Sequence, residues 1–331
     1  MIHERIQYMN ESSDLEVRLR GALNDGDTAQ VKALLDAGAD ANTVYENGWT
    51  ALMVAHTVDN ARVLLDAGAD MEAVDDVGET ALMSAAQWGY ADRVRLLLDA
   101  GADIHKKEKY GQTALELAAG QGHTDIVRML LEAGANINTV GGDALIAAAY
   151  SGHTETARFL LDIGADKTAI NKLGWTALTH AVSMGYEDTV KLLLDAGFDV
   201  NVRHSYGNTT PLIIAAMEDR PETARVLLDA GADVDATSEG GSTALMLAAE
   251  LEEPDVTEVL LQYGAKVDIA NEAGWSPLLI AADNGYTETV RLLLCAGADA
   301  HITNQDGKTP LMLAEEKGHA EVASLLRDAM P

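Results

Sequence analysis

The sequence predicts an all-α repeat solenoid, and three observations support this fold class. The tripeptide Gly-Ala-Asp, or a near copy of it, recurs nine times between Gly38 and Gly297 at intervals of 30 to 34 residues. A residue that caps helices, followed by Ala or Pro and then Leu, recurs at the same interval. Aromatic residues make up 5% of the chain, so Ala, Leu, Val and Ile must fill the interior. Self-similarity at a fixed period of this length is typical of stacked repeats.

The second marker predicts a short first helix in each copy. Threonine before a helix accepts hydrogen bonds from backbone N–H groups, and proline is favoured at the first helical position. Asp143 and Ser276 replace the threonine with other capping residues. In the copy at 78–104, the Ala-rich helix starts after Thr80 and ends at Gly89, which suits a left-handed C-terminal turn. Proline follows the capping residue in three copies, at Pro211, Pro277 and Pro310.

A second helix follows in each copy. In the segment "ADRVRLLLDA", Val94, Leu97 and Leu98 share one face by their spacing, and Gly101 ends the helix. Helices of this length are marginal in water when isolated. Neighbouring copies must therefore stack to bury their apolar faces, so that each copy contacts only its neighbours.

The copy "GETALMSAAQWGYADRVRLLLDAGADI" at 78–104 resembles the ankyrin repeat, and the resemblance extends over about residues 15 to 330. It implies an ankyrin repeat array with a helix-turn-helix and a β-hairpin finger per unit, about ten units in all, in a curved superhelix. Residues 1–14 would then form an N-terminal extension. Residues 15–331 would form a single ankyrin repeat domain, with a partial capping unit at 15–46 and nine repeats at 47–331, the last one capping.

The chain departs from the family pattern in three ways. The copy at 47–68 lacks three residues, and the sixth and seventh copies replace the Gly-His turn with "MEDRPE" and "LEEPDV". We expect local irregularity at these places. The histidine that the family carries after the conserved leucine is also absent, so we expect apolar packing there. Its place is taken by Met53, Met83, Glu116, Ile146, Thr179, Ile213, Met246, Leu279 and Met312.

The net charge and the sequence motifs limit which functions are possible. Lys and Arg number 23 against 53 for Asp and Glu, a formal net charge of -30, which disfavours nucleic acid and anionic lipid and attracts basic partners. The sequence has a single cysteine, Cys295, and neither an apolar signal-peptide core in "MIHERIQYMNESSD" nor an apolar run long enough to cross a membrane. It also has no catalytic, cofactor or metal-binding motif. We therefore expect a cytoplasmic, monomeric protein that is not an enzyme, has no cofactor or metal, and binds neither nucleic acid nor membrane directly.

The resemblance implies a concave recognition face made by the finger tips, the residue after the hairpin glycine and the end of each first helix. Aromatic residues occupy these positions, and such residues dominate binding hot spots. The alternative is that the indoles pack against adjacent fingers and stiffen the hairpins. The expected protein-binding residues are Tyr45, Trp49, Trp88, Tyr110, Tyr150, Trp175, Met184, Tyr206 and Trp275, rimmed by Glu46, Asp76, Glu79, Glu239 and Glu272. The wider rim includes Asp75, Glu218, Glu250, Asp283 and Asp306.

The sequence thus favours a non-catalytic protein–protein interaction module, which grips a partner with a basic surface through this aromatic and acidic face. Aromatic side chains would supply affinity, and carboxylates would steer the encounter. The alternative is an inhibitor or immunity protein that masks the active site or the nucleic-acid-binding site of a basic enzyme or toxin.

Overall fold

The structure, a computed structural model, describes residues 2–139, 143–205 and 207–330. Contacts divide the chain into two compact halves, Met1–Asp166 and Lys167–Pro331. Over the described residues the chain forms twenty α-helices, one 3-10 helix and no strand. Of the expected β-hairpins, the described residues form only two isolated bridges, between Val44 and Thr50 and between Thr237 and Thr243. The prediction of an all-α repeat array is confirmed.

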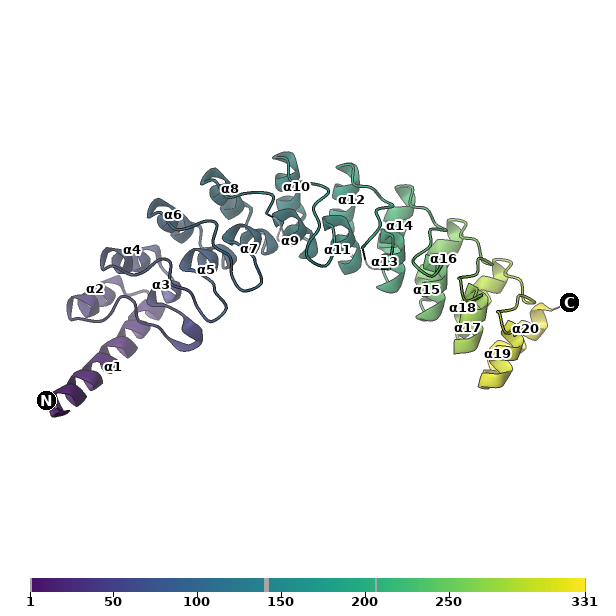
Figure 1. Cartoon of the computed structure of the whole chain (residues 1–331), viewed down its shortest axis with the longest axis horizontal. Coiled ribbons are helices and arrows are strands. Elements are labelled where there is room, and N and C mark those ends of the chain that lie inside the picture. Colours follow the sequence, from purple (N-terminus) through teal and green to yellow (C-terminus); the bar gives the residue numbers. More distant parts are fainter. Residues whose placement is uncertain (1, 140–142, 206, 331) are drawn as a thin grey trace. The chain divides into compact units, whose positions relative to one another are not determined.

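The first half contains five pairs of antiparallel helices, and the odd-numbered member of each pair comes first (Figure 1). The first helices are α1 (Ile2–Asp25), α3 (Ala51–Val54), α5 (Ala81–Gln87), α7 (Ala114–Gly120) and α9 (Ala144–Tyr150). The second helices are α2 (Thr28–Asp36), α4 (Val58–Asp66), α6 (Ala91–Asp99), α8 (Thr124–Glu132) and α10 (Thr154–Asp162), and η1 (Glu46–Gly48) precedes α3. The boundary predicted at residue 14 falls inside α1.

The second half repeats this arrangement with five more pairs. Its first helices are α11 (Ala177–Met184), α13 (Pro211–Met217), α15 (Ala244–Glu250), α17 (Pro277–Asn284) and α19 (Pro310–Lys317). Its second helices are α12 (Glu187–Asp195), α14 (Pro221–Asp229), α16 (Pro254–Gln262), α18 (Thr287–Cys295) and α20 (Ala320–Ala329). Within each half the odd-numbered helices form one row and the even-numbered helices a second row (Figure 1). Within each half, each helix packs against its partner and against the corresponding helix of the next repeat.

The core consists of thin layers of small and aliphatic side chains. Leu82, Leu115 and Leu145 are among the largest fully buried side chains, and Ala85 and Ala118 fill the spaces between helices. No Phe, Tyr or Trp among the residues whose burial is described belongs to this core. The aromatic side chains whose burial is described are therefore at the surface or partly covered, as the composition predicts.

The first helices start as predicted, because their capping residues bond to the backbone. Thr80 Oγ1 accepts from Met83 N at 3.2 Å, and the prolines of α13, α17 and α19 stand at the start of their helices. The expectation of purely apolar packing at the missing histidine is wrong in four repeats. Glu116 Oε2 accepts from Thr113 N at 2.7 Å, and Met53, Met83 and Thr179 close the same reciprocal cap. A reciprocal cap satisfies two helix-end donors at once.

The shortened repeat, the copy at 47–68, closes the end of its first helix in a different way. Its first helix, α3, is four residues long, and Arg93 of α6 covers its C-terminal end. Arg93 Nη1 donates to Met53 O at 3.4 Å and also to Ala55 O. The Tyr90 ring lies 4.7 Å from the guanidinium, and burial lowers the pKa of Arg93 to about 10. A buried cation thus replaces the helical turn that the repeat lacks.

The turns that join the two helices of the sixth and seventh copies keep the conformation of this turn in the other repeats. The irregularity expected there is therefore absent. Asp219 and Glu252 adopt φ of 48° and 61°, the left-handed region that glycine occupies at this place in most other repeats. Pro221 and Pro254 then open α14 and α16. The turn is kept at the cost of backbone strain in two residues that have a Cβ atom.

A hydrogen bond from one repeat closes the end of the first helix in the preceding repeat. His123 Nε2 donates to Gln87 O at 3.1 Å, and His319 Nε2 donates to Asp283 O at 3.0 Å. Arg220 takes this role in the sixth turn, where its Nε donates to Ser183 O at 3.1 Å. These side chains are structural, as the repeat pattern predicts for His123 and His319.

Candidate protein-binding site

The surface predicted to bind protein is formed by two parts of each repeat. One part is the loop that precedes the first helix, which we call the finger, and the other is the C-terminal end of the first helix. Both lie on the side of the odd-numbered helices (Figure 1). We call this surface of each half its finger face.

Several fingers are shaped by one polar side chain that accepts hydrogen bonds from the backbone that follows it. Asn271 Oδ1 accepts from Ala273 N and Trp275 N, both at 3.0 Å, and Asn171 binds Leu173 N and Trp175 N in the same way. Asn and Asp favour such turns because the side chain mimics a backbone acceptor. Gly274, at φ 78°, then turns the chain so that the tryptophan follows at the base of the finger.

Neighbouring fingers are joined by backbone hydrogen bonds. In the first half, Asp76 N donates to Asn47 O at 3.1 Å and Lys109 N donates to Val77 O at 2.9 Å. In the second half, Glu239 N donates to Gly207 O at 2.7 Å and Glu272 N donates to Gly240 O at 3.0 Å. Three of the predicted rim residues therefore fix the fingers through their backbone while their side chains face solvent.

The predicted aromatic residues of the first half are exposed on the finger face, with one exception. Trp88, at the end of α5, is 58% exposed, Tyr110 of a finger 67% and Tyr150, at the end of α9, 51%. Trp49 is also exposed. Tyr45 is instead half-buried beneath Arg20, whose guanidinium lies 5.1 Å from the ring, and burial raises the pKa of Tyr45 to about 12.

The two tryptophans of the second half differ from each other. The Trp175 ring is stacked on His180, with centroids 5.0 Å apart, and is tilted against His204 of the next finger at 4.6 Å. Trp175 therefore packs against an adjacent finger, as the alternative interpretation expects. Trp275 is half-buried and lines a pocket, and Met184 is exposed at the end of α11. Tyr206 lies outside the described residues.

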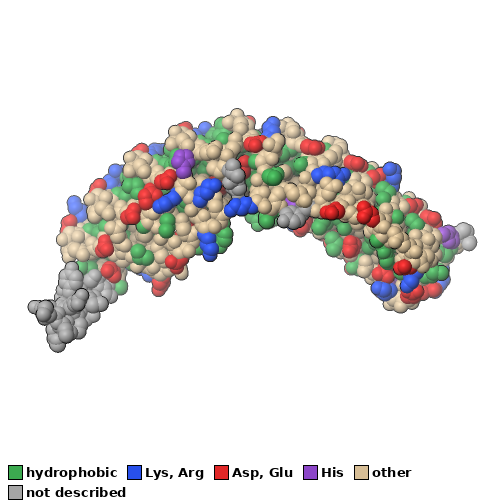
Figure 2. Space-filling model, viewed as in Figure 1, with side chains coloured by type: hydrophobic (Ala, Val, Ile, Leu, Met, Phe, Trp, Pro, Cys, Tyr) green, Lys and Arg blue, Asp and Glu red, His purple; other side chains and the backbone are tan. Residues whose placement is uncertain are grey.

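The acidic rim is largely solvated. Glu46, Asp76, Glu239 and Glu272 are exposed, whereas Glu79 is half-buried. Burial, followed by the neighbouring carboxylates of Asp75 and Glu108, raises the pKa of Glu79. Figure 2 shows acidic side chains on the visible face of both halves, interspersed with lysine and arginine.

Exposed aliphatic side chains, which sequence reasoning missed, extend the finger face. They occupy the same repeat positions as the predicted aromatics, so the position within the repeat was a sufficient signal. They are Val77 and Leu173 before the finger glycine, and Met217 and Leu251 at the ends of first helices.

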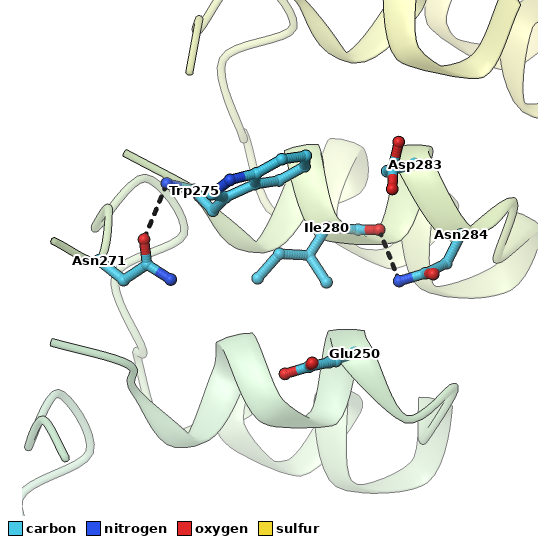
Figure 3. Close-up of a pocket in the computed structure, with 6 residues that line it drawn as sticks. All are labelled: Glu250, Asn271, Trp275, Ile280, Asp283 and Asn284. Carbon is cyan, nitrogen blue, oxygen red and sulfur yellow. Dashed lines mark hydrogen bonds between the residues drawn. The ribbon is translucent and has the colours of Figure 1, made fainter. Parts of the chain in front are cut away.

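A pocket of about 320 Å³ opens on the finger face of the second half (Figure 3). The Trp275 ring and the Ile280 side chain form its apolar wall, and Glu250 of α15 lies across from Trp275. Asn284 Nδ2 is tied to Ile280 O at 3.1 Å, and Asp283 pairs with Lys317 at 3.3 Å. The lining residues are Glu250, Asn271, Trp275, Ile280, Asp283 and Asn284.

Within the part of the chain that the structure describes, no three His, Cys, Asp or Glu side chains are grouped so that they could hold a metal ion. In the same residues no helix combines the length and the apolar character that crossing a membrane requires.

Comparison with protein families places the whole repeated region in one group. A family model that describes three consecutive ankyrin repeats matches the chain in overlapping segments. The matched residues are 19–108, 57–141, 94–171, 139–204, 164–238, 202–271 and 245–330. Ankyrin repeats generally mediate interactions between proteins and are generally not catalytic. A search of curated proteins found no match.

Proposed function

Because the chain belongs to the ankyrin repeat family, we propose that it is a non-catalytic protein-binding module and that the finger face is its binding surface. The observation that carries this proposal is the distribution of aromatic side chains. Trp88, Tyr110 and Tyr150 are each more than half exposed, although no aromatic side chain whose burial is described belongs to the core. Large aromatic side chains exposed along one surface are typical of binding hot spots.

The charge of the chain supports a partner with a basic surface. The formal net charge is -30, and carboxylates border the aromatic side chains at Glu46, Asp76, Glu239 and Glu272. Such a rim accelerates encounter with a cationic surface and suppresses wrong partners. The association rate should therefore fall as salt screens these charges.

The experiment is affinity capture from the native organism with the wild type and two variants. W88A/Y150A removes two exposed rings from the finger face. I163A removes an exposed apolar side chain, 46% exposed, beyond the end of the second helix α10. We expect W88A/Y150A to lose the captured protein and I163A to retain it. Equal capture by the two variants, with their helical signal intact, would contradict the assignment of the finger face.

Capture at two salt concentrations addresses the charge of the partner. A basic partner should be lost preferentially at high salt. A captured basic nuclease or toxin would favour the inhibitor or immunity role over a scaffolding role, and a set of neutral partners would contradict both the basic surface and that role.

We further propose that residues 15–331 form one ankyrin repeat domain that acts as a cytoplasmic monomer. The recurrence of the same helix pair in both halves and the single cysteine support this proposal. Light scattering on the purified chain tests it, since a monomer has a mass of 35.1 kDa.

A further inference from the structure

Two fingers of the second half share a motif and lie one hundred positions apart in the sequence. The residues that surround their tryptophans differ. Asn171 and Trp175 correspond to Asn271 and Trp275. Around Trp175, the two histidines His180 and His204 cover the ring. Around Trp275 the corresponding residues are an isoleucine and an asparagine, and no aromatic ring or cation of the described residues stacks on the indole. The Trp275 ring instead lines the pocket, together with the isoleucine that replaces the stacked histidine.

The same exchange leaves a hydrogen-bond donor in the pocket. Asn171 Nδ2 lies 2.9 Å from His180 Nε2, which accounts for its hydrogen bond. Asn271 has the same orientation, because its Oδ1 is held by two backbone N–H groups, but it faces Ile280, whose side chain accepts no hydrogen bond. Among the described residues, Asn271 Nδ2 has no partner.

The pocket also presents a carboxylate whose charge is not neutralised by a neighbour. Asp283 is paired with Lys317 at 3.3 Å, and the other nearby cation, Lys308, is paired with Glu316 at 2.6 Å. Glu250 has no ion pair or hydrogen bond within the described chain, and its carboxylate lies across the pocket from the indole (Figure 3). An indole face opposite a carboxylate is suited to a flat cation.

We infer that this pocket binds the guanidinium of an arginine side chain presented by the partner protein. The inference rests on the proposed function, since it identifies what the finger face recognises at Trp275. The guanidinium plane stacks on the indole, its N–H groups donate to Glu250, and Asn271 Nδ2 donates to a main-chain carbonyl of the same segment. A volume of about 320 Å³ accommodates one long side chain. The lysine ammonium lacks a planar face and stacks less well.

The test uses the full-length chain labelled with 5-fluorotryptophan, which gives one ¹⁹F resonance for each of the four tryptophans. Single Trp-to-Phe variants assign the resonances. The probes are a blocked Gly-Arg-Gly tripeptide, the same peptide with citrulline, which has the shape of arginine without its charge, and the lysine peptide. Trp175 serves as an internal control, because His180 and His204 cover its ring.

We expect the arginine peptide at millimolar concentration to move the Trp275 resonance and to leave Trp175 in place. Citrulline should weaken binding by about tenfold, as expected for loss of a cation stacked on an indole. E250Q should weaken it by about fivefold, the upper range for an exposed ion pair. E258Q makes the same charge change on the second helix α16 and should have no effect.

Three results would overturn the inference: a Trp275 resonance that the arginine peptide does not move, equal responses to arginine and citrulline, or equal responses to arginine and lysine. These outcomes are distinct from failure of the proposed function. If the partner is still captured through Trp88 and Tyr150 but the arginine peptide does not move the Trp275 resonance, only the assignment of the pocket is wrong. If W88A/Y150A captures the partner as well as the wild type does, the proposed function falls.

Discussion

The indole of Trp175 stacks on the imidazole of His180, with ring centroids 5.0 Å apart and an interplanar angle of 24°. Burial, and the nearby His204, lower the pKa of His180 from 6.5 to about 4. The folded chain therefore binds this proton less tightly than the unfolded chain does. The stabilising contribution of the stacked pair should be complete above pH 6.5 and should be lost as the pH falls through about 4.

Replacing His180 with asparagine tests this dependence. The difference in free energy of unfolding between the wild type and H180N should be constant above pH 6.5 and should shift against the wild type between pH 6.5 and 4. NMR titration of the His180 ring should give a midpoint near 4. A midpoint near 6.5 would show that the ring is solvated and not stacked.

The contribution of Asp143 to stability has the opposite dependence on pH. Its carboxylate caps α9 through Leu145 N at 2.8 Å. Burial is the main cause that raises its pKa from 3.8 to about 6, with Glu116 and Asp166 adding to the rise and the backbone bonds opposing it. Because the folded state binds the proton more tightly, the contribution of this carboxyl to stability is complete below pH 3.8 and is lost as the pH rises through about 6.

Asparagine caps helices as well as aspartate does, without the charge. D143N should therefore be more stable than the wild type by about 1–2 kcal/mol at pH 8 and indistinguishable from it at pH 3.5, as measured by urea unfolding. The matched control is D27N, since Asp27 caps α2 through Gln30 N at an exposed position. If D27N shows the same dependence on pH as D143N, burial of Asp143 is not the cause.

Arg93 should contribute more to stability than an exposed arginine on the same helix. R93A leaves the Met53 and Ala55 carbonyls without their donor in the short repeat, and an unsatisfied buried polar group costs about 1–3 kcal/mol. R95A alters an exposed arginine on the same helix and should cost less than about 0.5 kcal/mol. Equal losses in chemical denaturation would show that the guanidinium does not cap α3.

Relief of strain at Glu252 should stabilise the chain. Its φ of 61° costs a residue with a Cβ atom about 1–2 kcal/mol. Glycine removes that cost but gains entropy when unfolded, so E252G should raise the free energy of unfolding by about 0.5–1 kcal/mol. The reverse change at an equivalent turn, G285A, should be destabilising, since a Cβ atom there would lie 2.5 Å from His319 Nδ1. A thermal melt of the two variants gives opposite shifts if the turns are equivalent.

Features set by neighbours in the chain were predictable from sequence. The cap at Thr80, the left-handed Gly89 and the prolines that open helices depend on local pattern alone, and the structure contains them. The environments of Trp175 and Trp275 were not predictable in this way. Whether an indole is covered depends on residues in the same helix and in the next finger, here His180 and His204. Comparing the two motifs position by position gives the one signal that separates them.

The partner of Arg93 illustrates the same limit. Its acceptor Ala55 lies 38 positions earlier, in a repeat whose deletion removed the usual helix end. The pattern revealed that three residues were missing, but not what would occupy their place. A side chain from another repeat compensates, and only the packing of helices shows which one.

The bonds from His123, Arg220 and His319 all run in one direction along the chain, from a side chain to a carbonyl of the preceding repeat. A cut between two repeats therefore leaves two different ends. The fragment that keeps the earlier repeat loses the donor to the carbonyl at the end of its last first helix, and the fragment that keeps the later repeat loses the acceptor of its histidine or arginine.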